Sequence, residues 1–345
     1  MAFWLRCAAA LATLAVVGAF DRPLIFGSGY MYGSWKEQGM DKQMAWDRES
    51  LDKIVAMGGK STGASFNWVN IEPVEGTYDW TYSDWVVNNT LAHNLTAFAY
   101  SGNTPDWALD PSHKGLGYRF PPKEEFSAQF SAFFTQLAQR YRGQIKYYEF
   151  WNEQNGCGWI KDGCTNSDQA ASYAPWLCRW YKAMKAGDPD ATLALGGLDY
   201  ALNNPQGYTW LEDLYTAGAG DCFDAVPLHP YGDLSSPGQE LHWQALQDTH
   251  STLVKHNHGS KLLWINEWGW NSADEEAKAS AVTTVLSGLK SSNYSYVLSA
   301  TYLALSDLPG TPDTGHGWGL MSQNTTAEEL SPRPSYVAFQ DFVKQ

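Results

Sequence analysis

The chain has 345 residues, of which 44% are hydrophobic, and its formal net charge is −14. This length can bury a large core, and one barrel of about 250 residues or more uses nearly all of it. The acidic balance argues against a basic binding face, so we expect no nucleic-acid partner and no membrane partner. Seventeen Trp and nineteen Tyr are many for this length, and they suit either a large aromatic core or aromatic surfaces along a cleft.

Residues 1–19 have the pattern of a secretory signal. Arg6 precedes an apolar run over residues 7–17, and Gly18 and Ala19 supply small residues before a cleavage site. The run is too short for a comfortable membrane span, although an uncleaved anchor is the alternative. We therefore expect a secreted, extracellular protein whose single domain covers residues 20–345. Sequons, which favour a glycoprotein, occur at Asn88, Asn94, Asn293 and Asn324.

Four cysteines remain beyond the expected signal: Cys157, Cys164, Cys178 and Cys222. An even number in an exported chain predicts two disulfides, for which three pairings are possible. We favour Cys157–Cys164, which closes a small loop, with Cys178–Cys222, which ties a helix to the loop before a strand. The spacing does not fit a zinc ribbon, so we expect no metal site.

The hydrophobic patterns, taken along the chain, predict eight strand–helix units. The expected strands cover residues 23–29, 60–68, 95–100, 145–151, 192–196, 223–229, 261–266 and 296–305. The expected helices cover residues 41–57, 82–93, 123–142, 167–186, 208–217, 239–256, 273–289 and 333–343. Such alternation favours a parallel sheet, and at this length we expect an α/β fold with a closed (β/α)8 TIM barrel rather than an open sheet.

Two expected strands are followed within two residues by a glutamate, Glu153 after one and Glu267 after the other. The carboxyl ends of parallel strands form the edge at which such folds bind ligands. Alternation of side chains along a strand groups Glu149, Trp151 and Glu153 on one face. It likewise groups Leu263 and Ile265 with Glu267. If both faces point inward, the two strand-end glutamates meet at the barrel mouth.

The Trp-Asn-Glu motif at residues 151–153 and the strand-end Glu267 resemble the clan A retaining glycoside hydrolases. Family 39 is the closest in pattern and family 5 is next. Supporting motifs occur in the expected order, namely Trp-Val-Asn-Ile-Glu-Pro at 68–73, Thr-Pro-Asp-Trp at 104–107, His-Pro-Tyr at 229–231 and Gly-Trp-Gly-Leu at 317–320. These enzymes are (β/α)8 barrels that carry the acid/base after the fourth strand and the nucleophile after the seventh.

The resemblance implies that Glu267 attacks the anomeric carbon and that Glu153 serves as acid/base, which requires a raised pKa for Glu153 and an ionised Glu267. Asn152 is expected to bind the sugar 2-hydroxyl, and His229 and Tyr231 are expected to orient Glu267. Candidate platforms for sugar rings, each with plain packing as the alternative, are Trp107, Trp268, Trp270, Tyr302 and Trp318. No metal or organic cofactor is required.

Two departures from the family pattern affect the prediction. Gln154 stands where Pro is usual after Asn-Glu, and we expect it to loosen the following loop. Little chain remains for the accessory β-sandwich of family 39 β-xylosidases, which favours a bare barrel. We therefore predict a monomeric retaining endo-glycosidase that acts on a polysaccharide such as a β-glucan, a hemicellulose or an exopolysaccharide. The alternatives are a catalytically silent carbohydrate-binding barrel and a transglycosylase that uses the same two glutamates.

Overall fold

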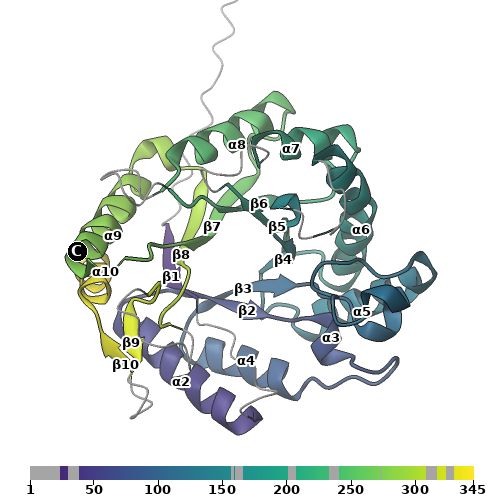
Figure 1. Cartoon of the computed structure of the whole chain (residues 1–345), viewed down its shortest axis with the longest axis horizontal. Coiled ribbons are helices and arrows are strands. Elements are labelled where there is room, and N and C mark those ends of the chain that lie inside the picture. Colours follow the sequence, from purple (N-terminus) through teal and green to yellow (C-terminus); the bar gives the residue numbers. More distant parts are fainter. Residues whose placement is uncertain are drawn as a thin grey trace, which may run out of the picture.

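Eight parallel strands close into a barrel, and helices surround it (Figure 1). The computed structural model describes residues 24–29, 39–156, 159, 166–200, 207–232, 241–272, 274–307, 317–323 and 330–345. Each strand pairs with the next along the chain, and β8 pairs with β1 to complete the closure. The predicted (β/α)8 TIM barrel is confirmed.

The barrel strands are β1 Ile25–Ser28, β2 Ser61–Ser65, β3 Thr96–Ser101, β4 Tyr147–Asn152, β5 Thr192–Asp199, β6 Ala225–His229, β7 Leu262–Trp268 and β8 Val297–Tyr302. The helices are α2 Met40–Ala56, α3 Trp68–Ile71, α4 Thr81–Ala92, α5 Ser127–Arg140, α6 Asn166–Gly187, α7 Gly207–Thr216, α8 Trp243–Lys255, α9 Glu275–Leu289 and α10 Pro334–Val343. Short 3-10 turns are η1 Asp106–Ala108, η2 Pro111–His113, η3 Glu124–Phe126, η4 Gln154–Gly156 and η5 Ser292–Tyr294.

Some elements differ from the expectation. The short helix α3 was not predicted, nor was the two-stranded antiparallel sheet of β9 Met321–Gln323 and β10 Leu330–Pro332. β5 continues to Asp199, beyond its expected end at Gly196. Helix α8 begins at Trp243 rather than at residue 239, because Leu241 pairs with Tyr231 in an isolated bridge.

The core has two layers. A small cluster fills the barrel interior near the amino ends of the strands, with Phe98, Tyr147 and Trp264 as its largest side chains. The outer layer lies between strands and helices and is rich in aromatic rings. Helix α5 shows how the sequence builds this layer. Its Phe130, Phe133, Phe134, Leu137 and Ala138 recur at helical spacing and are all buried.

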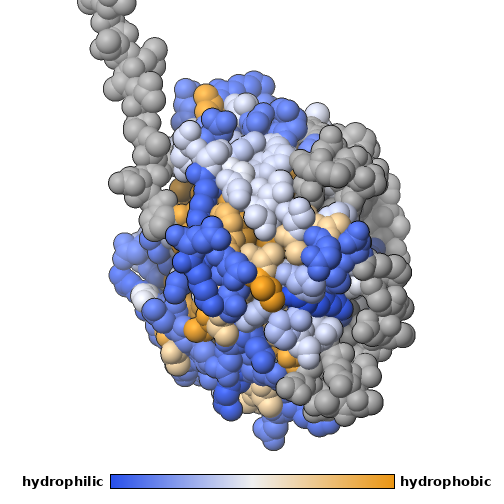
Figure 2. Space-filling model, turned by 90° about the vertical axis from the view of Figure 1, so that its left-hand side faces the viewer, coloured by the Kyte–Doolittle hydropathy of each residue, from blue (hydrophilic) through white to orange (hydrophobic). Residues whose placement is uncertain are grey.

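Cys178 of α6 is disulfide-bonded to Cys222, which precedes β6, so this half of the predicted pairing is confirmed. Cys157 and Cys164 lie outside the described residues, as do Asn324 and the expected signal at 1–19. Among the described helices, none is both long and apolar enough to cross a bilayer. Seen from the side of α9 and α10, the surface is mostly hydrophilic, with small hydrophobic patches (Figure 2).

Candidate active site

The two strand-end glutamates meet at the mouth of the barrel. Glu153 directly follows β4, and Glu267 lies in the last part of β7. His229, at the end of β6, is fully buried beside them. One ligand atom each of Glu153, His229 and Glu267 lies within 4.8 Å of the others. The acids keep 40% and 29% of their side chains exposed, so both remain accessible.

The route by which Glu267 reaches the mouth differs from the expected alternation. Leu263 and Ile265 pack in the outer core layer, whereas Trp264 belongs to the barrel interior. Between Ile265 and Trp268, β7 advances three residues while its partner β8 advances two. Such a bulge shifts the alternation by one position. It therefore brings Glu267 to the mouth and sends Trp268 outward, and the expected common face of Leu263, Ile265 and Glu267 is wrong.

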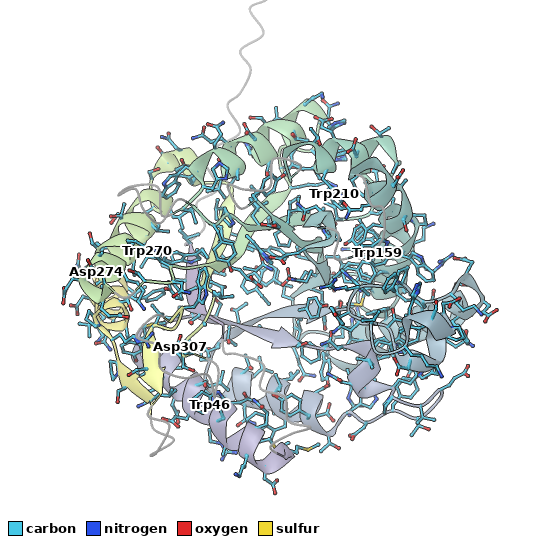
Figure 3. The ribbon with its side chains drawn as sticks, viewed as in Figure 1. Trp46, Trp159, Trp210, Trp270, Asp274 and Asp307 are labelled. Carbon is cyan, nitrogen blue, oxygen red and sulfur yellow. A yellow bond between two sulfur atoms is a disulfide. The ribbon has the colours of Figure 1, made fainter. Side chains whose placement is uncertain are left out.

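An unusual backbone conformation at the end of β4 orients Glu153. The backbone of Trp151 has φ 76° and that of Glu153 has φ 47°, both in the left-handed region that non-glycine residues rarely adopt. The Trp151 ring packs on Trp159, 4.6 Å between centroids, and the Trp159 indole donates to Ser172 on α6. Trp159 lies between β4 and α6 (Figure 3). Trp151 therefore faces the helices, not the barrel interior as expected.

β5 holds the loop after Glu153 and leaves room for the histidine. A Cβ on Gly197 would collide with the His229 ring and with the Asn266 amide, so only glycine fits there. Gln154 is fully buried and donates to the Gly196 carbonyl oxygen at 2.9 Å. Asn155 donates to the Asp199 carbonyl oxygen and accepts from the Asp199 amide. The expectation that Gln154 loosens this loop is therefore wrong, because it anchors the loop to β5.

Glu149 lies one layer deeper than the mouth. It accepts a hydrogen bond from the Asn266 amide at 2.9 Å. Burial is the main cause that raises the pKa of Glu149 to about 7, and the negative charge of Glu267 adds to it against the opposing charge of His229. Glu149 thus adds a third carboxyl group beneath the two strand-end acids, and its position is that of a structural acid.

His229 dominates the electrostatics of the mouth. Its Nδ1 lies 2.8 Å from Glu153 and 3.5 Å from Glu267, so its closer partner is Glu153 and not Glu267 as expected. Although burial opposes its charge, the nearby carboxylates raise the pKa of His229 to about 9. The two carboxylates therefore favour the charged form of the imidazole.

The pKa values of the two acids are shifted in the directions opposite to those expected, and His229 is the reason. Burial raises the pKa of Glu153, but the hydrogen bond and charge of His229 outweigh it, so the net pKa is lowered. Burial also raises the pKa of Glu267, and there the more distant His229 and the Tyr231 hydroxyl offset it only in part. In the free site Glu153 is the stronger acid of the two.

Tyr231 and Trp318 line the side of Glu267. The Tyr231 hydroxyl donates to Glu267 Oε2 at 2.9 Å, which agrees with its expected orienting contact. The Trp318 ring meets the Tyr231 ring edge-on, 5.5 Å between centroids. Trp318 and Trp270 are both half-buried, and Asn152 is half-buried at the end of β4. Partial exposure is compatible with a ligand contact for each of the three, and these contacts stay predictions.

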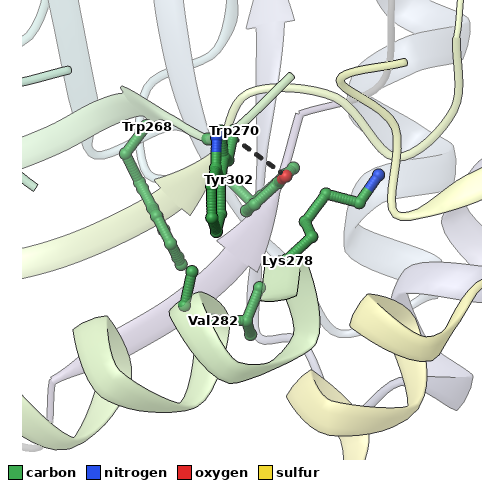
Figure 4. Close-up of a pocket in the computed structure, with 7 residues that line it drawn as sticks. Trp268, Trp270, Lys278, Val282 and Tyr302 are labelled. Atoms are coloured by element: carbon green, nitrogen blue, oxygen red, sulfur yellow. Dashed lines mark hydrogen bonds between the residues drawn. The ribbon is translucent and has the colours of Figure 1, made fainter. Parts of the chain in front are cut away.

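Two of the expected sugar platforms are wrong. Trp268 and Tyr302 are only 2% and 1% exposed, and their rings pack edge to face under α9. Figure 4 shows them above Val282, with the Trp270 amide donating to the Tyr302 hydroxyl oxygen. Trp107 is half-buried, and its indole donates to the Glu72 carbonyl oxygen. Its possible contact with a sugar stays a prediction.

Glu153, His229 and Glu267 also have the chemistry of a metal site, because carboxylate and imidazole groups bind divalent ions. A metal ligand must be a neutral imidazole, whereas the two carboxylates stabilise the charged form of His229 and raise its pKa. The two carboxyl groups beside this imidazole also suit acid–base and nucleophilic chemistry.

Comparison with known proteins agrees with this reading. The sequence profile of the family described as "Glycosyl hydrolase catalytic core" matches residues 104–331, which include Glu153 and Glu267. No curated protein sequence matches the chain.

Solved structures show the same fold at low identity. A family 39 glycoside hydrolase from the gut symbiont Bacteroides cellulosilyticus WH2 has 19% identity and a TM-score of 0.71, covering 93% of this chain and 64% of its own. This chain thus spans less than two thirds of that protein. GH5_18 from Streptomyces cattleya, in complex with GlcNAc, has 14% identity and a TM-score of 0.66, covering 94% and 80%. The family 1 β-glucosidase from Thermotoga maritima has 12% identity and a TM-score of 0.64, covering 93% and 97%.

Because the profile match extends over more than half of the chain, the protein belongs to the glycosyl hydrolase catalytic core family, as its resemblance to glycoside hydrolases predicted.

Proposed function

We propose that the protein is a secreted retaining glycoside hydrolase that cleaves within a polysaccharide, with Glu267 as nucleophile and Glu153 as acid/base. The observation that carries this proposal is the spacing of the two acids. Their nearest carboxylate oxygens lie within 4.8 Å. Retaining enzymes hold the two carboxyl groups about 5–5.5 Å apart, whereas inverting enzymes leave about 6.5–9.5 Å for a water molecule.

In the first step, a Glu267 oxygen bonds to the anomeric carbon while the glycosidic bond breaks. The leaving oxygen takes the proton of Glu153. Tyr231 holds Glu267 Oε2 through its hydroxyl, which fixes the direction of the attacking oxygen. In the second step, Glu153 removes a proton from water, whose oxygen attacks the anomeric carbon and releases Glu267. Asn152 contacts the sugar 2-hydroxyl in both steps.

The pKa order in the free site requires that substrate binding raise the pKa of Glu153. Glu153 has 40% of its side chain exposed, so a sugar that covers it removes water from this carboxyl group. Loss of water favours the protonated form of a carboxyl group. Burial already raises the pKa of Glu153, and only the contact with His229 reverses that effect. A bound sugar therefore strengthens the group's ability to donate a proton.

Endo action and export have separate support. The described residues form one barrel and one small sheet, and the half-buried Trp270 and Trp318 offer rings to a long sugar chain. The substrates we propose are a β-glucan, a hemicellulose or an exopolysaccharide. The Cys178–Cys222 disulfide is typical of an oxidising compartment, which agrees with the signal pattern at residues 1–19.

The test is a product profile by mass spectrometry with a panel of β-linked polysaccharides, using the Glu267→Gln variant as blank. Internal cleavage products that are absent from the blank support the proposal and identify the backbone. Release of monosaccharides alone contradicts endo action. Binding without any product contradicts catalysis and supports the silent carbohydrate-binding barrel. Products longer than the substrate reveal transfer to a sugar acceptor.

A further inference from the structure

We propose that two buried cations, Lys278 and Arg333, position Trp318 as a wall of the substrate site. The inference rests on the proposed function only in its second half, since Trp318 can be held in place whether or not a sugar binds beside it. Neither cation is part of the motifs that identify the family, and neither contacts Glu153 or Glu267 in the described contacts.

Lys278 reaches from α9 to the segment that carries Trp318. Its side chain is 0% exposed, and its ammonium group donates to the carbonyl oxygens of Gly317 at 3.2 Å and Gly319 at 3.1 Å. These are the two residues that flank Trp318. Figure 4 shows the Lys278 side chain extending from α9 away from Trp268. A third contact, 2.9 Å to Glu275, supplies the opposite charge.

Arg333, the residue before α10, holds the same segment from another side. One of its guanidinium nitrogens donates to the Gly319 carbonyl oxygen at 2.9 Å, and another donates to Asp307 at 2.6 Å. Asp307 in turn accepts from the Gly319 amide at 2.8 Å. Both backbone groups of Gly319 are therefore bound by charged side chains.

The two glycines are required by this packing. A Cβ on Gly317 would collide with the Asp307 carboxylate, and one on Gly319 would collide with the backbone of Ser306. Gly317 also pairs with Ser272 in an isolated bridge. The segment is thus fixed by side chains and by backbone on both sides of Trp318, although Trp318 itself stays half-exposed.

The position of Trp318 matters because its ring lies 5.5 Å from that of Tyr231, which donates to Glu267. On the other side, Gly269 is close enough that a Cβ there would touch Trp318. The contacts therefore connect α9 and α10 to the proposed nucleophile through Trp318 and Tyr231. Two cations and two carboxylates balance in charge, so removal of one member leaves buried charge without a partner.

The first arm of the test does not depend on activity. The full chain is labelled with 5-fluorotryptophan, and the Trp318 resonance is assigned as the signal missing from the Trp318→Phe variant. We expect Lys278→Met, which keeps the length and apolar character of the buried stem, to shift or broaden this signal. The control is Lys290→Met. Lys290 is exposed, directly follows the same helix and contacts Phe342 rather than the residues around Trp318, so its loss should leave the signal unchanged.

The second arm measures kinetics on the substrate found by the product profile. Loss of a positioned aromatic wall should raise KM roughly tenfold in Lys278→Met and change kcat by less than about threefold. A purely structural defect would instead lower the amount of active enzyme at unchanged KM. Asp307→Asn, which keeps the acceptor for Gly319 but removes a charge, should show a smaller change of the same kind.

The outcomes separate the two halves of the proposal. An unchanged Trp318 signal in folded Lys278→Met overturns the positioning role. A changed signal with unchanged KM overturns the assignment of Trp318 as a wall of the substrate site. If Lys278→Met does not fold, Asp307→Asn decides both points. If the unaltered protein cleaves no polysaccharide, the proposed function fails, and the fluorine signals still support or overturn the positioning of Trp318.

Discussion

The two ends of the barrel interior are built from the same strands but have opposite chemistry. Near the amino ends, Phe98, Tyr147 and Trp264 pack together, with Phe98 and Tyr147 stacked at 4.8 Å between ring centroids. Near the carboxyl ends lie Glu149, Glu153, His229 and Glu267. On β4 the change from one to the other takes two residues, from Tyr147 to Glu149.

This difference shows how a barrel can keep charged groups in its interior. Burial of the acids is unfavourable, as the raised pKa of Glu149 and Glu267 shows. The aromatic layer beneath them supplies apolar packing that can offset such a cost and fixes the strands that carry the acids. We therefore expect substitutions at the aromatic end to lower stability, and substitutions at the charged end to lower activity.

The largest expected effect is a loss of activity on substitution of the two acids at the charged end. Glu153→Gln should lower kcat/KM by about 10²–10⁴-fold, as loss of a general acid does, and Glu267→Gln should lower it at least as much. Both changes keep the size of the side chain. Glu267→Gln removes a carboxyl group whose pKa burial raises, so it should not lower the melting temperature, whereas Glu153→Gln takes the closest carboxylate from buried His229 and should lower it. The measurement is steady-state kinetics with thermal unfolding in parallel. Near-normal activity in either variant would show that the role assigned to that residue is wrong.

The next largest expected effect is a loss of stability on substitution at the aromatic end. Phe98→Ala should lower the free energy of unfolding by about 3–5 kcal/mol, because it empties a ring-sized space between Tyr147 and Trp264. Denaturant unfolding measures this change. The comparison predicts that kcat/KM per folded molecule stays within about threefold at low temperature. A much larger loss of activity would mean that the two ends are coupled and not separate.

A smaller loss of activity tests how Glu267 is held at the charged end. Tyr231→Phe removes one hydrogen bond to Glu267, worth about 1.5–3 kcal/mol for a charged acceptor. The loss should appear in kcat and not in KM. Tyr215→Phe is the matched control, because its hydroxyl pairs with His258 at 2.8 Å, away from the mouth. Equal losses in both variants would contradict a specific role for Tyr231.

The last expected effect is a gain in stability. The pKa of Glu149 rises from 4.5 to about 7 on folding, so the folded state holds its proton over that range while the unfolded state loses it. The resulting cost is absent below pH 4.5 and complete above pH 7. A shift of that size corresponds to about 3 kcal/mol, so Glu149→Gln should stabilise the protein by up to about that amount at pH 8, with the gain gone near pH 4.5.

Unfolding by denaturant at the two pH values checks this prediction. A gain of the same size at both pH values would show that Glu149 is not the source of the charge cost. Activity gives an independent comparison, since the deeper position of Glu149 predicts a far smaller loss than that of Glu153→Gln.

The sequence was informative where periodicity and strand ends were sufficient. Alternating strands and helices predicted the barrel, and glutamates at strand ends predicted the meeting of Glu153 and Glu267. Sequence reasoning failed where the backbone departs from regular geometry. The β7 bulge reverses the alternation, so Trp268 turned out to be buried although its neighbour Glu267 reaches the mouth.

Other residues were missed because their partners lie far along the chain. Lys278 and Arg333 carry no local pattern, and their role depends on carbonyl groups contributed by a different segment. Gln154 was judged from what it replaces, whereas its effect comes from a bond to Gly196. The Gly196-Gly197 pair was the one local signal available, because adjacent glycines in a buried strand indicate close approach of other groups.

The left-handed backbone of Trp151 and Glu153 bears on the design of new enzymes. Such a conformation costs roughly 1–2 kcal/mol per residue and persists because its surroundings hold it. Here the surroundings include Trp159 and Gly102, where a Cβ would press against the Trp151 ring. Introducing the Trp-Asn-Glu motif into another barrel therefore transfers the acid without the backbone conformation that orients it. A graft needs the supporting Trp159 ring and the glycine that follows the neighbouring strand β3 as well.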